Sequence, residues 1–167
     1  VPLTMKDIVE RRLNSNQEDW KNNYFDTCDA IVQLKGKIKI IKNCKILKDM
    51  NKNTELEGGA IKVTEQTYRK LKGKEFDTAK LKLNEDLSKE EVKKHPIWKY
   101  LIGNLLNKYI DLVFKDFNNA MYIWVDTEEL NLRAWYVDRL DNRAWSDARA
   151  SLGSGRGRFA GVAPEAQ

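Results

Sequence analysis

The residues of this sequence best suited to recognition lie in its last third. Trp, Tyr, Arg, Asp, Asn and Ser alternate between residues 133 and 156, and the tripeptide Arg-Ala-Trp occurs at 133–135 and again at 143–145. Aromatic rings and guanidinium groups supply contact area and strong hydrogen bonds, while short polar side chains adapt to a partner. This mixture favours a ligand-binding surface over a plain polar hairpin.

The same segment is set apart by its composition. Residues 1–119 contain 21 Lys, 3 Arg and 3 Ala, whereas residues 120–167 contain no Lys, 6 Arg and 8 Ala. The first part holds 24 basic and 18 acidic residues, and the second holds 6 basic and 7 acidic residues. The basic excess of the chain, which has a net charge of +5, therefore lies away from the unusual tail.

Catalytic, cofactor and metal chemistry find little support in the sequence. The single histidine, His95, precedes a proline, and no second His accompanies a Ser or Cys nucleophile. The glycine-rich run 153–157 lacks the Lys-Ser/Thr of a P-loop. Cys28 and Cys44 lack zinc-site spacing, so we expect buried thiols. We expect a protein that is not an enzyme, with no catalytic residue, cofactor or metal.

The tail resembles the C-terminal variable region of the target proteins of diversity-generating retroelements. The resemblance is carried by Arg-Ala-Trp-Tyr-Val-Asp-Arg-Leu at 133–140, by the turn after it, and by the closing Gly-Arg-Phe-Ala-Gly-Val-Ala-Pro-Glu-Ala at 157–166. In that family a reverse transcriptase copies a template and randomises its adenines. The products are often phage or bacterial surface proteins that bind ligands on a C-type-lectin-like fold.

The resemblance also implies a cause for the composition boundary, because adenine randomisation removes the adenine-rich Lys codons and leaves Arg, Gly, Ser and Asp. The ligand-binding positions it implies are Tyr136, Asp138, Arg139, Asp141, Asn142, Arg143, Ser146, Asp147, Arg149, Ser151, Ser154 and Arg156. The scaffold positions it implies are Ala134, Trp135, Val137, Leu140, Ala144, Trp145, Leu152, Gly157, Phe159 and Val162. Tryptophan belongs to the scaffold because adenine changes in an Asn codon cannot produce it.

Several helices are predicted from capping residues and apolar spacing. Thr4 begins an N-terminal helix, and apolar residues three to four positions apart predict a second helix over about 17–31. Thr64 begins a short helix, and a capping box starts at Ser88. The strongest periodicity, over 96–117, predicts a long helix that a central Gly-Asn pair divides.

Extended segments are predicted between and after these helices. Alternation of Ile and Lys over 37–40 indicates a strand with one buried face, and a further β segment is predicted at 45–47. Gly58-Gly59 indicates a tight turn between extended runs. The remaining predicted strands lie at 76–83, 121–125, 133–140, 143–152 and 159–163.

These elements predict an α+β fold in which helices and a small basic β meander support a C-terminal antiparallel sheet. The Lys-rich section 1–119 and the variable-region-like section 120–167 are expected to pack together as one domain. A chain of this length can build its own core, and no apolar run is long enough to span a bilayer. The resemblance implies that this sheet belongs to a C-type-lectin-like fold.

The function predicted is recognition of a macromolecular ligand, with a host or environmental surface protein as the partner. The resemblance adds a trimer and a place on a virion tail or a cell surface. One alternative is a basic nucleic-acid-binding protein that uses Lys35, Lys37, Lys39 and Lys42 together with the Arg-Gly run 154–159. The same lysines could instead form the solvated face of an edge strand. A second alternative is a structural virion component.

Overall fold

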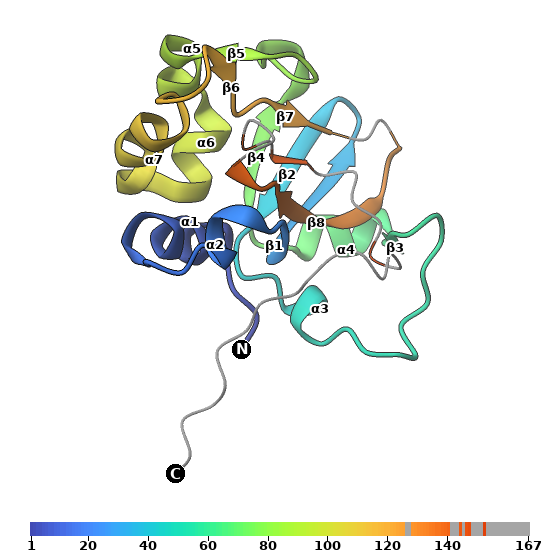
Figure 1. Cartoon of the computed structure of the whole chain (residues 1–167). Coiled ribbons are helices and arrows are strands. Elements are labelled where there is room, and N and C mark those ends of the chain that lie inside the picture. Colours follow the sequence, from blue (N-terminus) through green and yellow to red (C-terminus); the bar gives the residue numbers. More distant parts are fainter. Residues whose placement is uncertain (126–127, 141–143, 145, 148–151, 153–167) are drawn as a thin grey trace.

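The computed structural model describes residues 1–125, 128–140, 144, 146–147 and 152. A sheet runs through the middle of the molecule between two groups of helices (Figure 1). Its strand order is β4-β2-β1-β8-β9-β7, and β3 pairs with β8 outside this path. Within the described part of the chain these pairings are antiparallel, apart from the parallel pairing of β7 with β9. The predicted α+β class is confirmed.

The elements follow the chain in this order. The helices are α1 (Met5–Asn14), α2 (Asp19–Asn22), α3 (Lys45–Lys48), α4 (Glu65–Lys70), α5 (Lys89–Lys94), α6 (Pro96–Ile102) and α7 (Leu106–Val113), with 3-10 turns η1 (Thr78–Lys80) and η2 (Gly103–Leu105). The strands are β1 (Phe25–Leu34), β2 (Lys37–Ile41), β3 (Ile61–Lys62), β4 (Lys74–Asp77), β5 (Leu87–Ser88), β6 (Asn119–Ala120), β7 (Ile123–Trp124), β8 (Asn131–Val137) and β9 (Ser146–Asp147).

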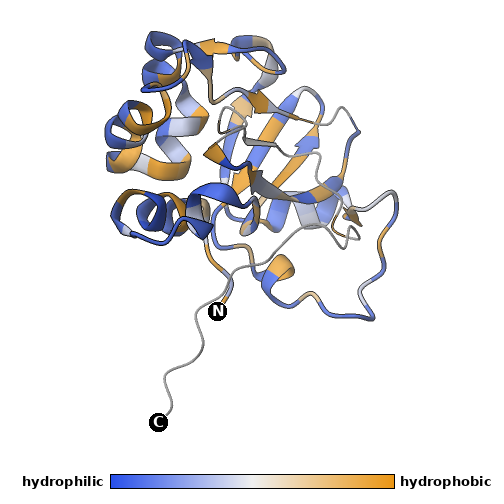
Figure 2. Cartoon of the chain, viewed as in Figure 1, coloured by the Kyte–Doolittle hydropathy of each residue, from blue (hydrophilic) through white to orange (hydrophobic). Residues whose placement is uncertain are grey.

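Two hydrophobic clusters cover the two faces of the sheet. On the first face, α1, α6 and α7 contribute buried side chains such as Ile8, Trp98 and Tyr109. On the second face, α3 and α4 contribute Leu47 and Tyr68 to a smaller cluster. Figure 2 shows the apolar residues of α6 and α7 beside the sheet. We call these sides the first face and the second face below.

Strand β8 lies inside this arrangement, although it belongs to the tail. It pairs with β1, β3 and β9, so the N-terminal and C-terminal parts of the chain share one sheet. Leu132 and Ala134 join the cluster on the second face, whereas Trp135 and Val137 join the cluster on the first face. Six of its seven residues are buried, and only Tyr136 is half-buried.

Most of the predicted helix ends are confirmed by their caps. The Thr4 side chain accepts a hydrogen bond from the Asp7 amide at 3.2 Å, and the Asp7 carboxylate accepts one from the Thr4 amide at 2.8 Å. A second reciprocal box joins Ser88 and Glu91. Gly103, whose φ is +55°, divides the long helix between α6 and α7 as predicted.

The helix predicted over 17–31 is wrong. Only the single turn α2 forms there, and the chain continues as β1. Strand β1 is buried on both faces because a hydrophobic cluster covers each face of the sheet, so its residues show no alternation of polar and apolar types. Apolar residues at helical spacing occurred there by coincidence, and pairing with distant strands decided the structure.

Two of the predicted extended segments are also corrected. Residues 45–47 form the helical turn α3, and β4 ends at Asp77, whose side chain accepts a hydrogen bond from the Ala79 amide and begins η1. The turn at Gly58-Gly59 is confirmed, since both residues have positive φ and Glu57 bridges Ala60. Strand β2 confirms the extended prediction at 37–40, but Lys39 is buried rather than wet.

A buried arginine connects α1 to the end of β8. Arg12 is only 1% exposed, and its Nε donates to the Trp20 carbonyl at 2.7 Å. Its Nη1 donates to the Tyr109 hydroxyl at 2.7 Å, and its Nη2 donates to the carbonyls of Asn23 at 3.0 Å and Asp138 at 2.6 Å. Arg12 therefore fixes where the chain leaves β8.

Replacing this arginine should destabilise the fold strongly. Arg12→Met leaves three carbonyls and a hydroxyl without their donor, and we expect a loss of about 3–5 kcal/mol in the free energy of unfolding. Chemical denaturation followed by tryptophan fluorescence measures this loss. Arg69→Met is the control, because the Arg69 side chain is 75% exposed and its ion pair with Glu65 should contribute less than about 1 kcal/mol. Equal losses in the two variants would contradict the role of Arg12.

Candidate ligand-binding face

Four positions from four strands lie side by side where β1, β8, β9 and β7 meet. Asp26 on β1 is in register with Tyr136 on β8, Tyr136 is in register with Asp147 on β9, and Asp147 is in register with Trp124 on β7. We call this set the cross-strand row. Two of its members, Tyr136 and Asp147, are among the predicted ligand-binding positions.

The adjacent row has a different character. It consists of Phe25, Val137, Ser146 and Ile123 in register. Phe25, Val137 and Ile123 belong to the core on the first face. Ser146 thus occupies a register position among core residues, whereas Asp147 occupies one beside Tyr136. This agrees with the period of two expected for a strand.

Tyr136 is the centre of a group of polar and aromatic contacts. Its ring lies 5.5 Å from the ring of Tyr24, and its hydroxyl donates to the Asp138 carboxylate at 3.2 Å. The same carboxylate oxygen accepts a hydrogen bond from the Arg139 amide at 2.8 Å. Asp138 is 6% exposed and therefore lies on the buried side of this group, while Arg139 is exposed.

Asp26 contributes an unusual carboxylate to the cross-strand row. Asp26 is 4% exposed, and its Oδ1 has no hydrogen-bond partner among the described residues. It lies just before a register shift in β1, between Asp26 and Ala30, where the strand departs from regular pairing. Removal from water raises the pKa of Asp26 to about 6, because burial disfavours the charged form.

The structure locates five of the twelve predicted ligand-binding positions. Tyr136, Asp138 and Arg139 lie at the end of β8 and just after it, and Ser146 and Asp147 form β9. Asp138 differs from an exposed recognition position, because it is buried and its carboxylate accepts hydrogen bonds from the Tyr136 hydroxyl and the Arg139 amide. The positions that lie outside the described residues are Asp141, Asn142, Arg143, Arg149, Ser151, Ser154 and Arg156.

The predicted scaffold positions are described in part. Ala134, Trp135, Val137 and Ala144 are each 0% exposed. Leu140 and Leu152 are half-buried and pack against the clusters on the first and second faces respectively. Trp145, Gly157, Phe159 and Val162 lie outside the described residues, as do the predicted strand 159–163 and most of the predicted strand 143–152.

Sequence reasoning missed three members of this region. Tyr24 and Asp26 belong to the segment predicted as a helix, and Trp124 was assigned only to a short apolar strand. No local signal marks Asp26, because its importance comes from pairing with a strand more than a hundred residues away. Tyr24 and Asp26 are two residues apart, which is compatible with one face of a strand. Only the register of β1 with β8 identifies that face.

The lysines of β2 and its turn do not form a free basic ladder. Lys35 pairs with Glu65 at 3.3 Å, and Lys37 pairs with Glu75 at 3.7 Å. Lys39 is 6% exposed, and its Nζ lies 4.1 Å from the ring centre of Tyr68. These acidic and aromatic partners neutralise much of the positive charge that the nucleic-acid alternative required.

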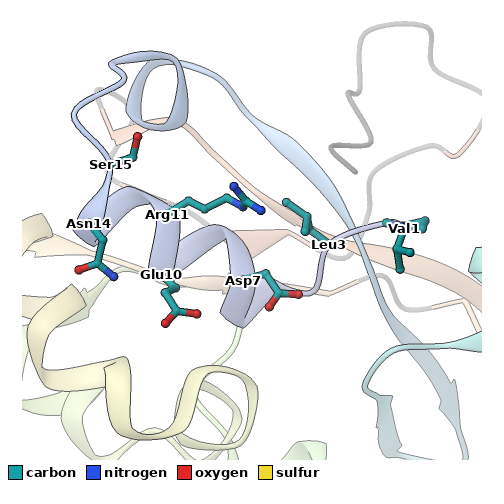
Figure 3. Close-up of a pocket in the computed structure, with 8 residues that line it drawn as sticks. Val1, Leu3, Asp7, Glu10, Arg11, Asn14 and Ser15 are labelled. Atoms are coloured by element: carbon teal, nitrogen blue, oxygen red, sulfur yellow. The ribbon is translucent and has the colours of Figure 1, made fainter. Parts of the chain in front are cut away.

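A shallow hollow of about 570 Å³ lies between the N-terminal segment and α1 (Figure 3). Two of its charged groups have structural partners: Asp7 caps α1, and the Arg11 guanidinium lies 4.9 Å from the ring centre of Trp20. None of the five predicted binding positions that the structure describes lines this hollow. It therefore does not compete with the cross-strand row as a candidate site.

Other chemistry can be located among the described residues. His95 caps α6 by accepting a hydrogen bond from the Ile97 amide, and its other ring nitrogen lies 2.9 Å from the Lys82 carbonyl. Cys28 and Cys44 are buried free thiols, as predicted. Within the described ranges no group of His, Cys, Asp and Glu has the arrangement of a metal site. The helices in the same ranges are too short or too polar to cross a membrane.

The fold is that of C-type lectins. A solved structure described as "Accommodation of massive sequence variation in Nanoarchaeota by the C-type lectin fold" superposes with a TM-score of 0.71 over 89% of this chain and 81% of that chain, at 15% sequence identity. The C-type-lectin-like architecture implied by the tail is thus confirmed. No family model matches the sequence, and no similar curated protein was found.

The buried carboxylate of Asp26 predicts a specific pH dependence of stability. Its pKa is about 6 in the folded chain, above the ordinary value of 3.8 that applies to the unfolded chain, so the folded state holds the proton more tightly. Stability from this group is therefore present below pH 4 and is lost as the pH rises through 6, by on the order of 2–3 kcal/mol.

Asp26→Asn should remove this loss, because the amide has no charge to bury. Urea denaturation at pH 4.5 and pH 7.5 measures it: relative to Asp26→Asn, the unsubstituted protein should be less stable at the higher pH. Asp116→Asn, at an exposed position, is the matched control and should leave the pH dependence unchanged. The same pH dependence in the unsubstituted protein and Asp26→Asn would contradict an uncompensated carboxylate.

Proposed function

We propose that the chain is a ligand-recognition protein whose binding surface is built from the tail after β8 and from the cross-strand row. The ligand is a macromolecule, such as a protein on a host or environmental surface. The protein belongs, in this proposal, to the targets of a diversity-generating retroelement, and it acts by binding rather than by catalysis. Display on a virion or a cell, as a trimer, is part of the same proposal.

One observation carries the proposal: the tail divides into buried scaffold residues and accessible polar residues within a few positions. Ala134, Trp135 and Val137 are fully buried, whereas Tyr136 between them is half-buried and Arg139 just beyond is exposed. A segment organised in this way can change its polar positions without disturbing its core. The nanoarchaeal C-type-lectin structure, described as accommodating massive sequence variation, gives a precedent for this fold.

The nucleic-acid alternative has less support. It depended on Lys35, Lys37, Lys39 and Lys42 and on the run 154–159. Each of the four lysines has an acidic or aromatic partner in the fold, and the run lies outside the described residues. A basic surface attracts phosphates when its charges are clustered and uncompensated. The lysines of β2 therefore fit a role in solubility and in packing against β4 and α4 better than a role in binding nucleic acid.

The proposal predicts unequal tolerance to substitution within the tail. Tyr136→Ser and Arg139→Ser should each lower the free energy of unfolding by less than about 1.5 kcal/mol, because their contacts are partly solvated. Trp135→Ser should lower it by about 3–5 kcal/mol, since it empties a fully buried site. Thermal and urea denaturation of the three variants provide the measurement. Large losses in the first two would show that these positions are not free to vary.

The retroelement itself is tested in the DNA that flanks the gene. We expect a near-copy of codons 130–165 that differs from the gene almost only at adenines and adjoins a reverse-transcriptase gene. Clones from a population should then differ at the codons of Tyr136, Arg139 and Asp147 while the codons of Trp135 and Val137 stay constant. Absence of such a repeat in the complete genome would remove the retroelement from the proposal.

A further inference from the structure

Asp26 lies outside the tail, yet it is next to the first position that the proposed diversification would change. It is in register with Tyr136 and two residues from Tyr24, and the rings of these two tyrosines lie 5.5 Å apart. By the alternation of β8, Tyr136 points to the second face, as Ala134 does, and residues in register share a face. Asp26 therefore lies on the same face as the tyrosine pair, and beside it.

The carboxylate of Asp26 is incompletely satisfied where it lies. Within the part of the chain that the structure describes, its Oδ1 is buried without a hydrogen-bond partner, and such a group costs free energy unless a donor reaches it. The contrast with Asp29, three residues along the chain, is direct: both oxygens of Asp29 accept backbone hydrogen bonds, from Met5 and Asn43, at 2.8 Å. The Asp29 carboxylate thus stabilises the fold through both of its oxygens, whereas Oδ1 of Asp26 can still accept a hydrogen bond.

Two charged side chains of this region, Asp138 and Arg12, have hydrogen-bond partners other than Asp26. Asp138, on the segment after β8, is a second buried carboxylate that the Tyr136 hydroxyl contacts. From α1, Arg12 directs its guanidinium to carbonyl and hydroxyl oxygens, including the Asp138 carbonyl. Aromatic rings beside carboxylates are a favourable environment for guanidinium and ammonium groups, through cation–π attraction and charge-assisted hydrogen bonds.

We infer that Asp26, with the rings of Tyr24 and Tyr136, forms a subsite for a guanidinium or ammonium group of the ligand. The inference rests on the proposed function and gives it a chemical preference. Because Asp26 and Tyr24 belong to the part of the chain before the tail, variation in the tail leaves them unchanged. The recognition surface then combines a constant part of the subsite, Asp26 and Tyr24, with a changing surround that includes Tyr136. Because Oδ1 is buried, neighbouring side chains must move for the cation to reach it.

Small probes test the subsite on the full chain without a known ligand. N-acetyl-arginine-amide is titrated against the protein at pH 7.5, and the neutral N-acetyl-citrulline-amide, which has the same shape, is titrated in parallel. NMR signals of the Tyr24 and Tyr136 rings and of the Asp26 amide report binding. We expect these signals to shift with the arginine probe, at an affinity at least about tenfold above that for citrulline, since one charge-assisted contact contributes about that factor.

Asp26→Asn separates the subsite from general electrostatic attraction. This variant keeps the shape of the side chain and removes its charge, so it should lower the affinity for the arginine probe to that for citrulline. Asp116→Asn removes one charge elsewhere and should leave the affinity unchanged. Equal binding of the two probes, undiminished arginine binding by Asp26→Asn, or an equal loss in Asp116→Asn would overturn the inference.

The outcome is independent of the test of the proposed function. A missing repeat beside the gene would remove the retroelement while leaving the response to arginine intact. Conversely, a confirmed repeat with no preference for arginine over citrulline would leave the diversified surface in place and remove only its constant basic-group anchor.

Discussion

The pairing of β8 with β1 is the interaction on which the rest of the structure depends. It joins the beginning of the chain to the tail, separates the two hydrophobic clusters, and places Tyr136 opposite Asp26. Because β8 is covered on both faces, its side chains must fit a packed interior at nearly every position. A segment proposed to vary therefore begins inside the core, and apart from the half-buried Tyr136 its freedom to vary starts where β8 ends.

Arg12 and Asp29 keep that pairing in place from the N-terminal side. Arg12 holds the Asp138 carbonyl, and Asp29 gathers the amides of Met5 and Asn43 around the irregular part of β1. Burial raises the pKa of Asp29, although the two amides oppose the shift by favouring its charged form. Each of these charged side chains forms hydrogen bonds with backbone groups of distant segments. These directional bonds fix the path of the chain, which a nonspecific attraction between charges would not do.

The fold could be predicted from the sequence where the signals were local. Capping at Thr4 and Ser88, the turn at Gly58-Gly59 and the break at Gly103 depend on neighbouring residues, and each was predicted correctly. Strand β1 could not be predicted, because burial on both faces erases the alternation that marks a strand. For the site, Tyr136 and Arg139 followed from the composition of the tail, whereas Asp26 required knowledge of a distant register. The resemblance supplied the lectin-like architecture that periodicity alone left open.

The distance along the chain between Arg12 and Asp138 has a consequence for biosynthesis. During translation β1 and β2 can form a hairpin early, since a two-residue turn at Lys35 and Gly36 joins them. The other side of β1 then waits for β8, and Arg12 waits for an acceptor 126 residues later. Closure of the sheet is a late, long-range event of high contact order. A nascent chain thus carries an open strand edge until its tail emerges, and the same tail whose sequence is proposed to vary completes the fold.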